Sequence, residues 1–396
     1  MAMNAFFTEL GRGVLAQWKR RNFALDLFPE IARAALEARR PCDHVDVHEL
    51  LRDFLLQDEQ PFQTQSGFGQ PELVVYDDPR FYIQVLFWLE GTTDIHQHKF
   101  SGAFHVLNGS SIHSRFDFLE PQAISAHLRV GRLRMSETHL LETGSTVPIF
   151  SGAHYVHSLF HLDTPSATVV VRTHSDPGTG PQFTYLPPHL AVDPFHHDAL
   201  TQRRKQVLDL LEQTEHPSYP ELLTEMLAEL DFERGFFILQ NAVGHLRALG
   251  CWQDAWEVFA EKHGAIADFV APTLEEIIRR DALVEMRRSI VETEHRFFLA
   301  LLLNVPDRPR ILELVGQRFP GNPVETILRW GSELVSSDPT ATWALDAELP
   351  ADLAEEEALA AFLRVLRAGL LGKKTPAALR PVHEALADSS WRVLLN

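Results

Sequence analysis

Cysteine is scarce in this sequence. Among 396 residues there are only Cys42 and Cys251, which lie far apart. Two distant thiols are too few for a disulfide framework or a zinc-thiolate site, so the small disulfide-stabilised class of protein is excluded. The scarcity fits a reducing compartment, and we therefore expect a cytoplasmic protein.

Basic residues and long apolar runs are also in short supply. Lysine and arginine number 36 against 54 acidic residues, which gives a net charge of -18. Such a field repels phosphate backbones, so nucleic acid is not an expected partner. No apolar stretch has the length of a membrane span, so we expect no membrane association. Glu9 and Arg12 interrupt the first apolar run, which indicates an amphipathic helix rather than a secretion signal.

The chain divides into three regions that differ in residue composition and in the spacing of apolar residues. Residues 1–58 repeat apolar residues at three- and four-residue steps, which predicts helices. Residues 59–190 contain short β-branched and aromatic runs separated by turn residues, which predicts an antiparallel sandwich or barrel. After a proline- and histidine-rich linker, residues 198–396 are helical almost to the end. The predicted fold class is α+β, with a barrel between N-terminal helices and a large all-α domain.

Histidine is the residue that the chain has in excess. Ten of its 20 histidines fall between His96 and His174. Residues two apart on a strand point to the same face, so His96 and His98 aim two imidazoles at one point. Neutral imidazole suits iron, zinc, copper or nickel. A third imidazole is expected from a neighbouring strand at His154, so the predicted metal ligands are His96, His98 and His154.

These stretches resemble the two cupin motifs. His96, His98 and Gly109 match the first motif, and Pro148, Gly152 and His154 match the second with altered spacing. The resemblance implies a cupin barrel (a double-stranded β-helix or jelly roll) from about Phe81 to Pro177, holding one metal ion. Gly102 or Ala103 occupies the place of the family's glutamate, which leaves a three-histidine site.

Within the cupins, the chain looks most like the cysteine dioxygenase group of thiol dioxygenases. The residues that carry this resemblance come from two segments: the lead-in strand (residues 86–98), which ends in the two histidines, and the region of the third ligand (residues 151–177). They are Trp88, Glu90, Gly91, Ile95, His161 and Pro165. The resemblance implies a non-haem iron dioxygenase in which Fe(II), or another divalent transition metal, lies on the three histidines. A small-molecule or carrier-bound thiol, or another bidentate substrate, would react there with O2, and a thiol would yield a sulfinic acid.

The sequence departs from that family at several places. Ala103 and His174 stand where the family has a crosslinked cysteine and tyrosine. The arginine that binds the substrate carboxylate is expected upstream of the lead-in strand, but residues 63–78 contain no arginine. Free cysteine is therefore not the expected substrate.

Three more histidines are candidates for catalysis: His105, His157 and His174. His105 shares a strand face with Ala103, so it is a ligand, base or pocket donor if that face points inward, and otherwise a hydrogen-bonded barrel histidine. His157 lies three residues after His154, so strand parity turns it outward unless a bulge at Gly152 intervenes. His174 either positions O2 or substrate, or lies at a surface strand end.

The helical region 198–396 matches no motif that indicates a function. It is expected to mediate a homodimer, cap the barrel mouth, or bind a partner or carrier-bound substrate. Two rival classes of protein are also compatible with the sequence. One is a non-oxygenase metallo-cupin such as an isomerase or lyase, and the other is a scaffold or binding protein with a structural barrel.

Overall fold

The computed structural model describes residues 3–64, 68–89, 91, 94–337 and 355–395. Helices and strands both contribute to the fold, so the predicted α+β class is confirmed, while the cupin assignment stays a prediction. Glu90, one residue of the family resemblance, lies outside the described residues. The predicted division into three domains also stays a prediction, and the elements are given below in chain order.

The N-terminal helices form an amphipathic layer. They are α1 (Met3–Arg20), η1 (Leu25–Leu27), α2 (Phe28–Arg39), α3 (Pro41–His44) and α4 (Val47–Leu56). In α1 the buried apolar residues recur at the spacing of one helix face: Phe7, Leu10, Val14 and Trp18. Asp46 caps α4 by accepting a hydrogen bond from the Glu49 backbone N–H at 2.8 Å.

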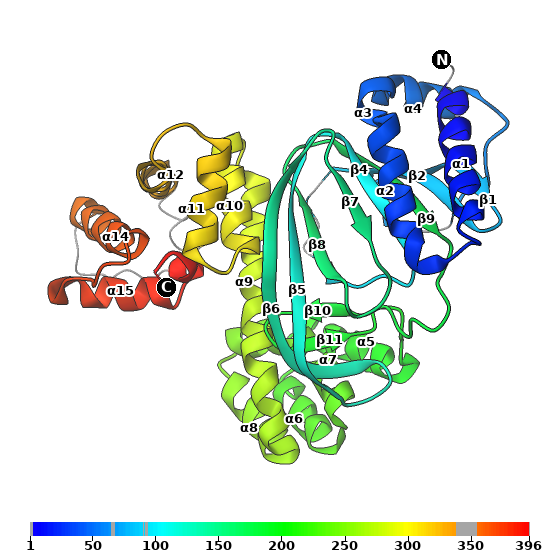
Figure 1. Cartoon of the computed structure of the whole chain (residues 1–396). Coiled ribbons are helices and arrows are strands. Elements are labelled where there is room, and N and C mark those ends of the chain that lie inside the picture. The colour runs from blue at the N-terminus through cyan, green and yellow to red at the C-terminus, as the bar shows by residue number, and fades with distance from the viewer. Residues whose placement is uncertain (1–2, 65–67, 90, 92–93, 338–354, 396) are drawn as a thin grey trace.

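These helices cover a five-stranded antiparallel sheet with the order β1-β2-β9-β4-β7. Its strands are β1 (Glu72–Asp78), β2 (Phe81–Trp88), β4 (Gly102–Asn108), β7 (Thr146–Ile149) and β9 (Ser166–Thr173). Along β2, Ile83 and Val85 pack against the helices, whereas Gln84 and Leu86 line a cavity on the opposite face. Both faces of β2 are buried, because helices cover one side and the second sheet covers the other (Figure 1).

The second sheet is a closed six-stranded barrel with the order β10-β11-β6-β5-β8-β3. Its strands are β3 (Ile95–His96), β5 (Ser110–Ala123), β6 (Leu128–Glu142), β8 (Val156–His161), β10 (Thr184–Leu186) and β11 (Leu190–Val192). The short strand β3 pairs with β8 through His96 opposite His157. Directly opposed residues are near neighbours, so this register brings two histidines together.

The C-terminal helices lie outside the barrel (Figure 1). They are α5 (Ala199–Gln213), α6 (Tyr219–Glu229), α7 (Phe232–Ala248), α8 (Trp252–His263), η2 (Gly264–Phe269), α9 (Val270–Ser289), α10 (Thr293–Asn304), α11 (Arg308–Arg318), α12 (Pro323–Ser337), α14 (Glu355–Leu370), η3 (Ala377–Leu379), α15 (Arg380–Ala387) and η4 (Ser390–Leu394). Phe160 and Leu162 belong to the same apolar core as α10, and Leu190 to the same core as α7. The helices and the barrel therefore share their cores, and Figure 1 shows α9 alongside β6. The homodimer through this region stays a prediction.

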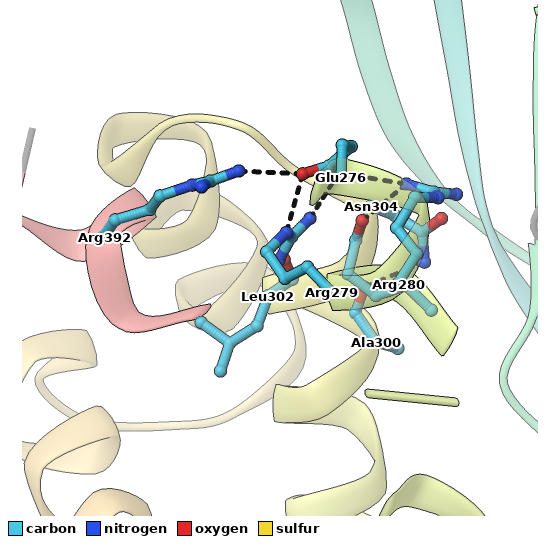
Figure 2. Close-up of polar contacts among 8 residues, drawn as sticks. Glu276, Arg279, Arg280, Ala300, Leu302, Asn304 and Arg392 are labelled. Atoms are coloured by element: carbon cyan, nitrogen blue, oxygen red, sulfur yellow. Dashed lines mark hydrogen bonds and ion pairs between the residues drawn. The ribbon is translucent and has the colours of Figure 1, made fainter. Parts of the chain in front are cut away.

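A buried charged network joins the C-terminal helices (Figure 2). Glu276 of α9 accepts hydrogen bonds from Arg279 at 2.6 and 2.8 Å and from Arg392 of η4 at 2.8 Å. Arg279 and Arg280 also donate to the carbonyls of Leu302 and Leu303 at 3.0 and 2.9 Å. Cations at these carbonyls complement the C-terminal end of α10, so the network fixes three elements at one point.

In the part of the chain that the structure describes, no helix is both long enough and apolar enough to cross a bilayer.

Candidate metal centre

Three imidazoles meet at one end of a cavity between the two sheets. They belong to His96 on β3, His98 two residues later, and His157 on β8, and their candidate ligand atoms all lie within 4.8 Å of one another. Their ring centres form a nearly equilateral triangle with sides of 4.6, 4.9 and 4.9 Å. The rings are held in place because a bridge to Ser151 anchors His98 and strand pairing anchors the other two.

The nitrogen atoms fit a divalent transition metal. His98 Nε2 and His157 Nε2 lie 2.8 Å apart. Two nitrogen ligands at about 2.1 Å from one ion are separated by about 3.0–3.4 Å, depending on the bond angle, so the observed spacing is close to that of a shared ion. His96 Nδ1 lies 3.2 Å from the carbonyl oxygen of Asp94. Donation to that carbonyl leaves Nε2 unprotonated, and this buried atom has no hydrogen-bond partner among the described residues.

Burial keeps these imidazoles neutral. It lowers the pKa of His96, and it lowers the pKa of His98 and His157 well below the ordinary value of a histidine. Desolvation is the largest cause in each case, and the neighbouring imidazoles lower the pKa of His98 and His157 further. A neutral imidazole is the form that ligates a metal, so the donor set suits iron, zinc, copper or nickel.

The third member of the cluster differs from the predicted ligand. His154 lies in the turn before β8 and is exposed, whereas His157 lies within the strand and is 3% exposed. Gly152 has a φ of +89°, so the chain turns sharply before Tyr155 and strand alternation starts only at β8. Parity counted from His154 was therefore wrong, and the inward positions are those of His157, Leu159 and His161.

The missing glutamate has a steric explanation. A Cβ atom on Gly102 would lie 2.1 Å from the Val171 carbonyl oxygen of β9, so this position has no room for a side chain. Ala103 is fully buried in the core that faces the N-terminal helices. Neither position can present a carboxylate to the three histidines, and the site keeps its all-imidazole character.

The cavity beside the cluster is small and mostly apolar. Its volume is about 50 Å³, and its walls come from β2, β4, β7, β8 and β9 together with Phe68 and Phe100. Three buried polar atoms on residues of the wall have no hydrogen-bond partner among the described residues: Gln84 Oε1, Trp88 Nε1 and His161 Nε2. A bound molecule with both donors and acceptors would satisfy such groups.

Arg172 on β9 also lines this cavity, and the motifs of the sequence did not indicate it. Its guanidinium carbon lies 5.1 Å from the centre of the Tyr82 ring. Its hydrogen bonds, at 3.3 and 3.4 Å, go to the backbone carbonyls of Thr173 and His174, and no ion pair to it is seen among the described residues. Burial lowers the pKa of Arg172. Its alternation with Thr168 and Val170 was the signal that could have identified it.

Two of the predicted catalytic histidines lie elsewhere. His105 is buried on the helix-facing side of β4, where its Nδ1 contacts the Thr146 hydroxyl at 2.7 Å and its Nε2 accepts from the Cys42 backbone N–H at 3.4 Å. It shares a face with Ala103 as predicted, but that face points away from the cavity. His174 follows the end of β9 and is exposed, with its Nε2 2.9 Å from the Asp78 carbonyl oxygen. Neither residue reaches the cluster.

Comparisons with known proteins identify no family. No family model matches the sequence, and no curated protein matches it. Among solved structures, hydroquinone 1,2-dioxygenase PnpCD in complex with Cd2+ and 4-hydroxybenzonitrile is 12% identical, with 28% of this chain and 69% of that chain covered and a TM-score of 0.21. Hydroquinone 1,2-dioxygenase from Sphingomonas sp. TTNP3 with 4-hydroxybenzoate bound is 10% identical, with 30% and 80% covered and a TM-score of 0.21. These TM-scores are too low to assign a fold or an activity.

Proposed function

We propose that this chain is a metal-dependent oxygenase that holds Fe(II) on His96, His98 and His157. The observation that carries the proposal is the convergence of three neutral imidazoles within 4.8 Å at a buried cavity. Iron bound there would supply open coordination positions for the substrate and O2, and a path for electrons from the substrate to O2. Buried histidines without such an ion would leave His96 Nε2 desolvated and unpaired, which is a costly arrangement.

The three histidines carry no charge to offset a divalent cation. An anionic donor such as a thiolate is therefore favoured as the substrate group, because its pKa falls on coordination. The proposed reaction adds both atoms of O2 to a thiolate and yields a sulfinate. Sulfur loses four electrons, O2 gains them, and no further reductant is needed. The apolar walls of the cavity, such as Leu86 and Phe104, exclude water from the reacting groups.

Arg172 supports a substrate that also carries a carboxylate. A half-buried guanidinium with no ion pair among the described residues is unfavourable, and its planar fork matches a carboxylate in two parallel hydrogen bonds. The cavity volume of about 50 Å³ favours a small thiol acid over a bulky ligand. Arg172 would thus bind the substrate carboxylate, the role of the arginine that is expected, and absent, between residues 63 and 78. A carrier-bound thiol is the other form of substrate that we propose to test.

Metal content and oxygen uptake test the proposal together. The full chain is purified without chelator, its metals are measured by elemental analysis, and oxygen uptake is followed after anaerobic loading with Fe(II). We expect about one metal per chain, and oxygen uptake that depends on a small thiol acid. His157→Ala should lose both metal and uptake, whereas the matched variant His154→Ala should keep both, since His154 lies outside the cluster.

The other outcomes separate the rival classes. Bound metal without oxygen uptake, for any thiol acid or carrier-bound thiol, would favour a metallo-cupin isomerase or lyase. If the wild-type chain binds no divalent metal, the proposal is overturned, and a scaffold or binding protein is the remaining interpretation. Loss of metal in His154→Ala with retention in His157→Ala would show that the wrong histidines have been assigned.

A further inference from the structure

A fourth buried histidine contacts the cluster from behind. His113 lies on β5, is 3% exposed, and has no part in the function proposed above. Its Nε2 lies 3.0 Å from Nδ1 of His157, on the opposite side of that ring from the atom that faces His98. The ring of His157 is therefore held between two imidazoles through its two nitrogen atoms.

This contact determines which nitrogen of His157 is free for a metal. An imidazole that ligates through Nε2 carries its proton on Nδ1, and that N–H needs an acceptor when it is buried. His113 Nε2 is placed to accept this hydrogen bond. The arrangement parallels that of His96, whose Nδ1 lies against the Asp94 carbonyl oxygen. Two of the three candidate ligands thus have an acceptor on the side away from the shared centre.

His113 itself is fixed by the sheet. It lies opposite His139 of β6 and Leu159 of β8, so strands pair with β5 on both sides of it. Its ring also meets the ring of Phe104 at 5.9 Å in an edge-to-face contact. A residue on a central strand with packed neighbours holds its position, which a support for a metal ligand requires.

We propose that His113 is a positioning residue, which accepts the Nδ1 hydrogen bond of His157 and so holds this ligand in the orientation and tautomer that leave Nε2 open to the metal. The inference rests on the metal site proposed above and adds a residue outside the three ligands. His113 does not touch the reacting groups, so its effect reaches the reaction only through His157.

The test measures metal affinity rather than activity. Titration of the full chain with Co(II) gives a dissociation constant, and the visible absorption of the bound ion reports its ligand geometry. His113→Leu removes the acceptor and should weaken binding by about 10- to 100-fold with an altered spectrum, the range typical of lost outer contacts at metal sites. His113→Gln supplies an amide oxygen as a new acceptor and should recover part of the affinity.

A matched control separates positioning from packing. His105→Leu removes a similarly buried strand histidine from the other sheet, on the side of β4 that faces the N-terminal helices, so it should lower the unfolding temperature without changing Co(II) affinity. If His113→Leu binds Co(II) as tightly as the wild type and with the same spectrum, the role of His113 is refuted. If the wild type itself binds no Co(II), Zn(II) or Fe(II), the proposed function fails instead, so the two failures are distinguishable.

Discussion

The guanidinium carbon of Arg172 lies 3.4 Å from the centre of the Phe100 ring, and the other contacts of that ring include the imidazole of His98 at 4.3 Å. A cation over an aromatic face is stabilised by the ring, and stacking on a carbon ring leaves the N–H groups of a guanidinium available in its plane. The contact therefore connects the only arginine that lines this small cavity, among the described residues, with the histidine cluster.

Replacement of Arg172 by methionine tests its role toward the substrate. Loss of a charge-assisted, two-point contact should weaken binding of a thiol acid by roughly 10- to 100-fold, which corresponds to about 1.5–3 kcal/mol. Arg172→Lys should not restore binding, because an ammonium group lacks the planar fork. Binding is followed by the visible absorption of the Co(II)-loaded protein. Equal affinity of Arg172→Met and the wild type for a thiol acid would contradict the assignment.

The Glu276 network makes a prediction about stability. Glu276→Gln removes the carboxylate that faces Arg279 and Arg392 and leaves buried positive charge without compensation. We expect a loss of about 3–5 kcal/mol in the free energy of unfolding, measured by urea titration. The neighbouring Glu275 is exposed, so Glu275→Gln should change stability by less than about 0.5 kcal/mol. Similar small effects of both substitutions would show that the network contributes little.

His161 predicts how stability depends on pH. Burial lowers the pKa of His161 to about 3, so between pH 3 and the ordinary value of about 6.5 only the unfolded chain binds this proton. The contribution of neutral His161 to the free energy of unfolding is therefore fully present above about pH 6.5 and is lost as the pH falls below it. The loss is about 1.4 kcal/mol for each pH unit from this one group. His161→Gln removes the titrating group and should make the decline shallower between pH 6.5 and 5. Urea titrations at several pH values measure the slope, and an unchanged slope would argue against this pKa shift.

Metal addition and removal should change stability through the cluster. A ligand that binds only the folded chain stabilises it by about 2.7 kcal/mol at 100 times its dissociation constant. Divalent metal should therefore raise the unfolding temperature of the wild type, and a chelator should reverse the change. His96→Ala lacks one ligand of the cluster and should show a much smaller response. A rise of equal size in both proteins would place the bound metal elsewhere on the chain.

Two of the three histidines of the cluster could be predicted from the sequence, for a physical reason. His96 and His98 lie two apart in an extended segment, and the two-residue period of a strand is a local property that sequence shows directly. The third imidazole depends on where β8 begins, and that is decided by the turn at Gly152 rather than by the spacing of histidines. The match to the second cupin motif placed the ligand close after this glycine, so it indicated His154 in the turn instead of His157 in the strand.

The alternation of side chains along a strand also did not show which face of the strand lines the cavity. Ala103 and His105 share a face, as the alternation predicted, but β4 is buried on both sides, and its pattern does not say which side holds the cavity. The same ambiguity hid Arg172, because every neighbour of that residue on β9 is buried. The helical segments were easier to predict, since their apolar residues recur at three- and four-residue steps around a single buried face.

The shared cores have a practical consequence for anyone who wishes to shorten this polypeptide. Helices bury the apolar outer side of each sheet, with Phe81 beneath the N-terminal layer and Phe160 beneath the C-terminal one. A fragment trimmed to the strands alone would expose two apolar surfaces to solvent and would be prone to aggregate. Assays, crystallisation and redesign of the histidine centre should therefore keep both flanking helical parts attached.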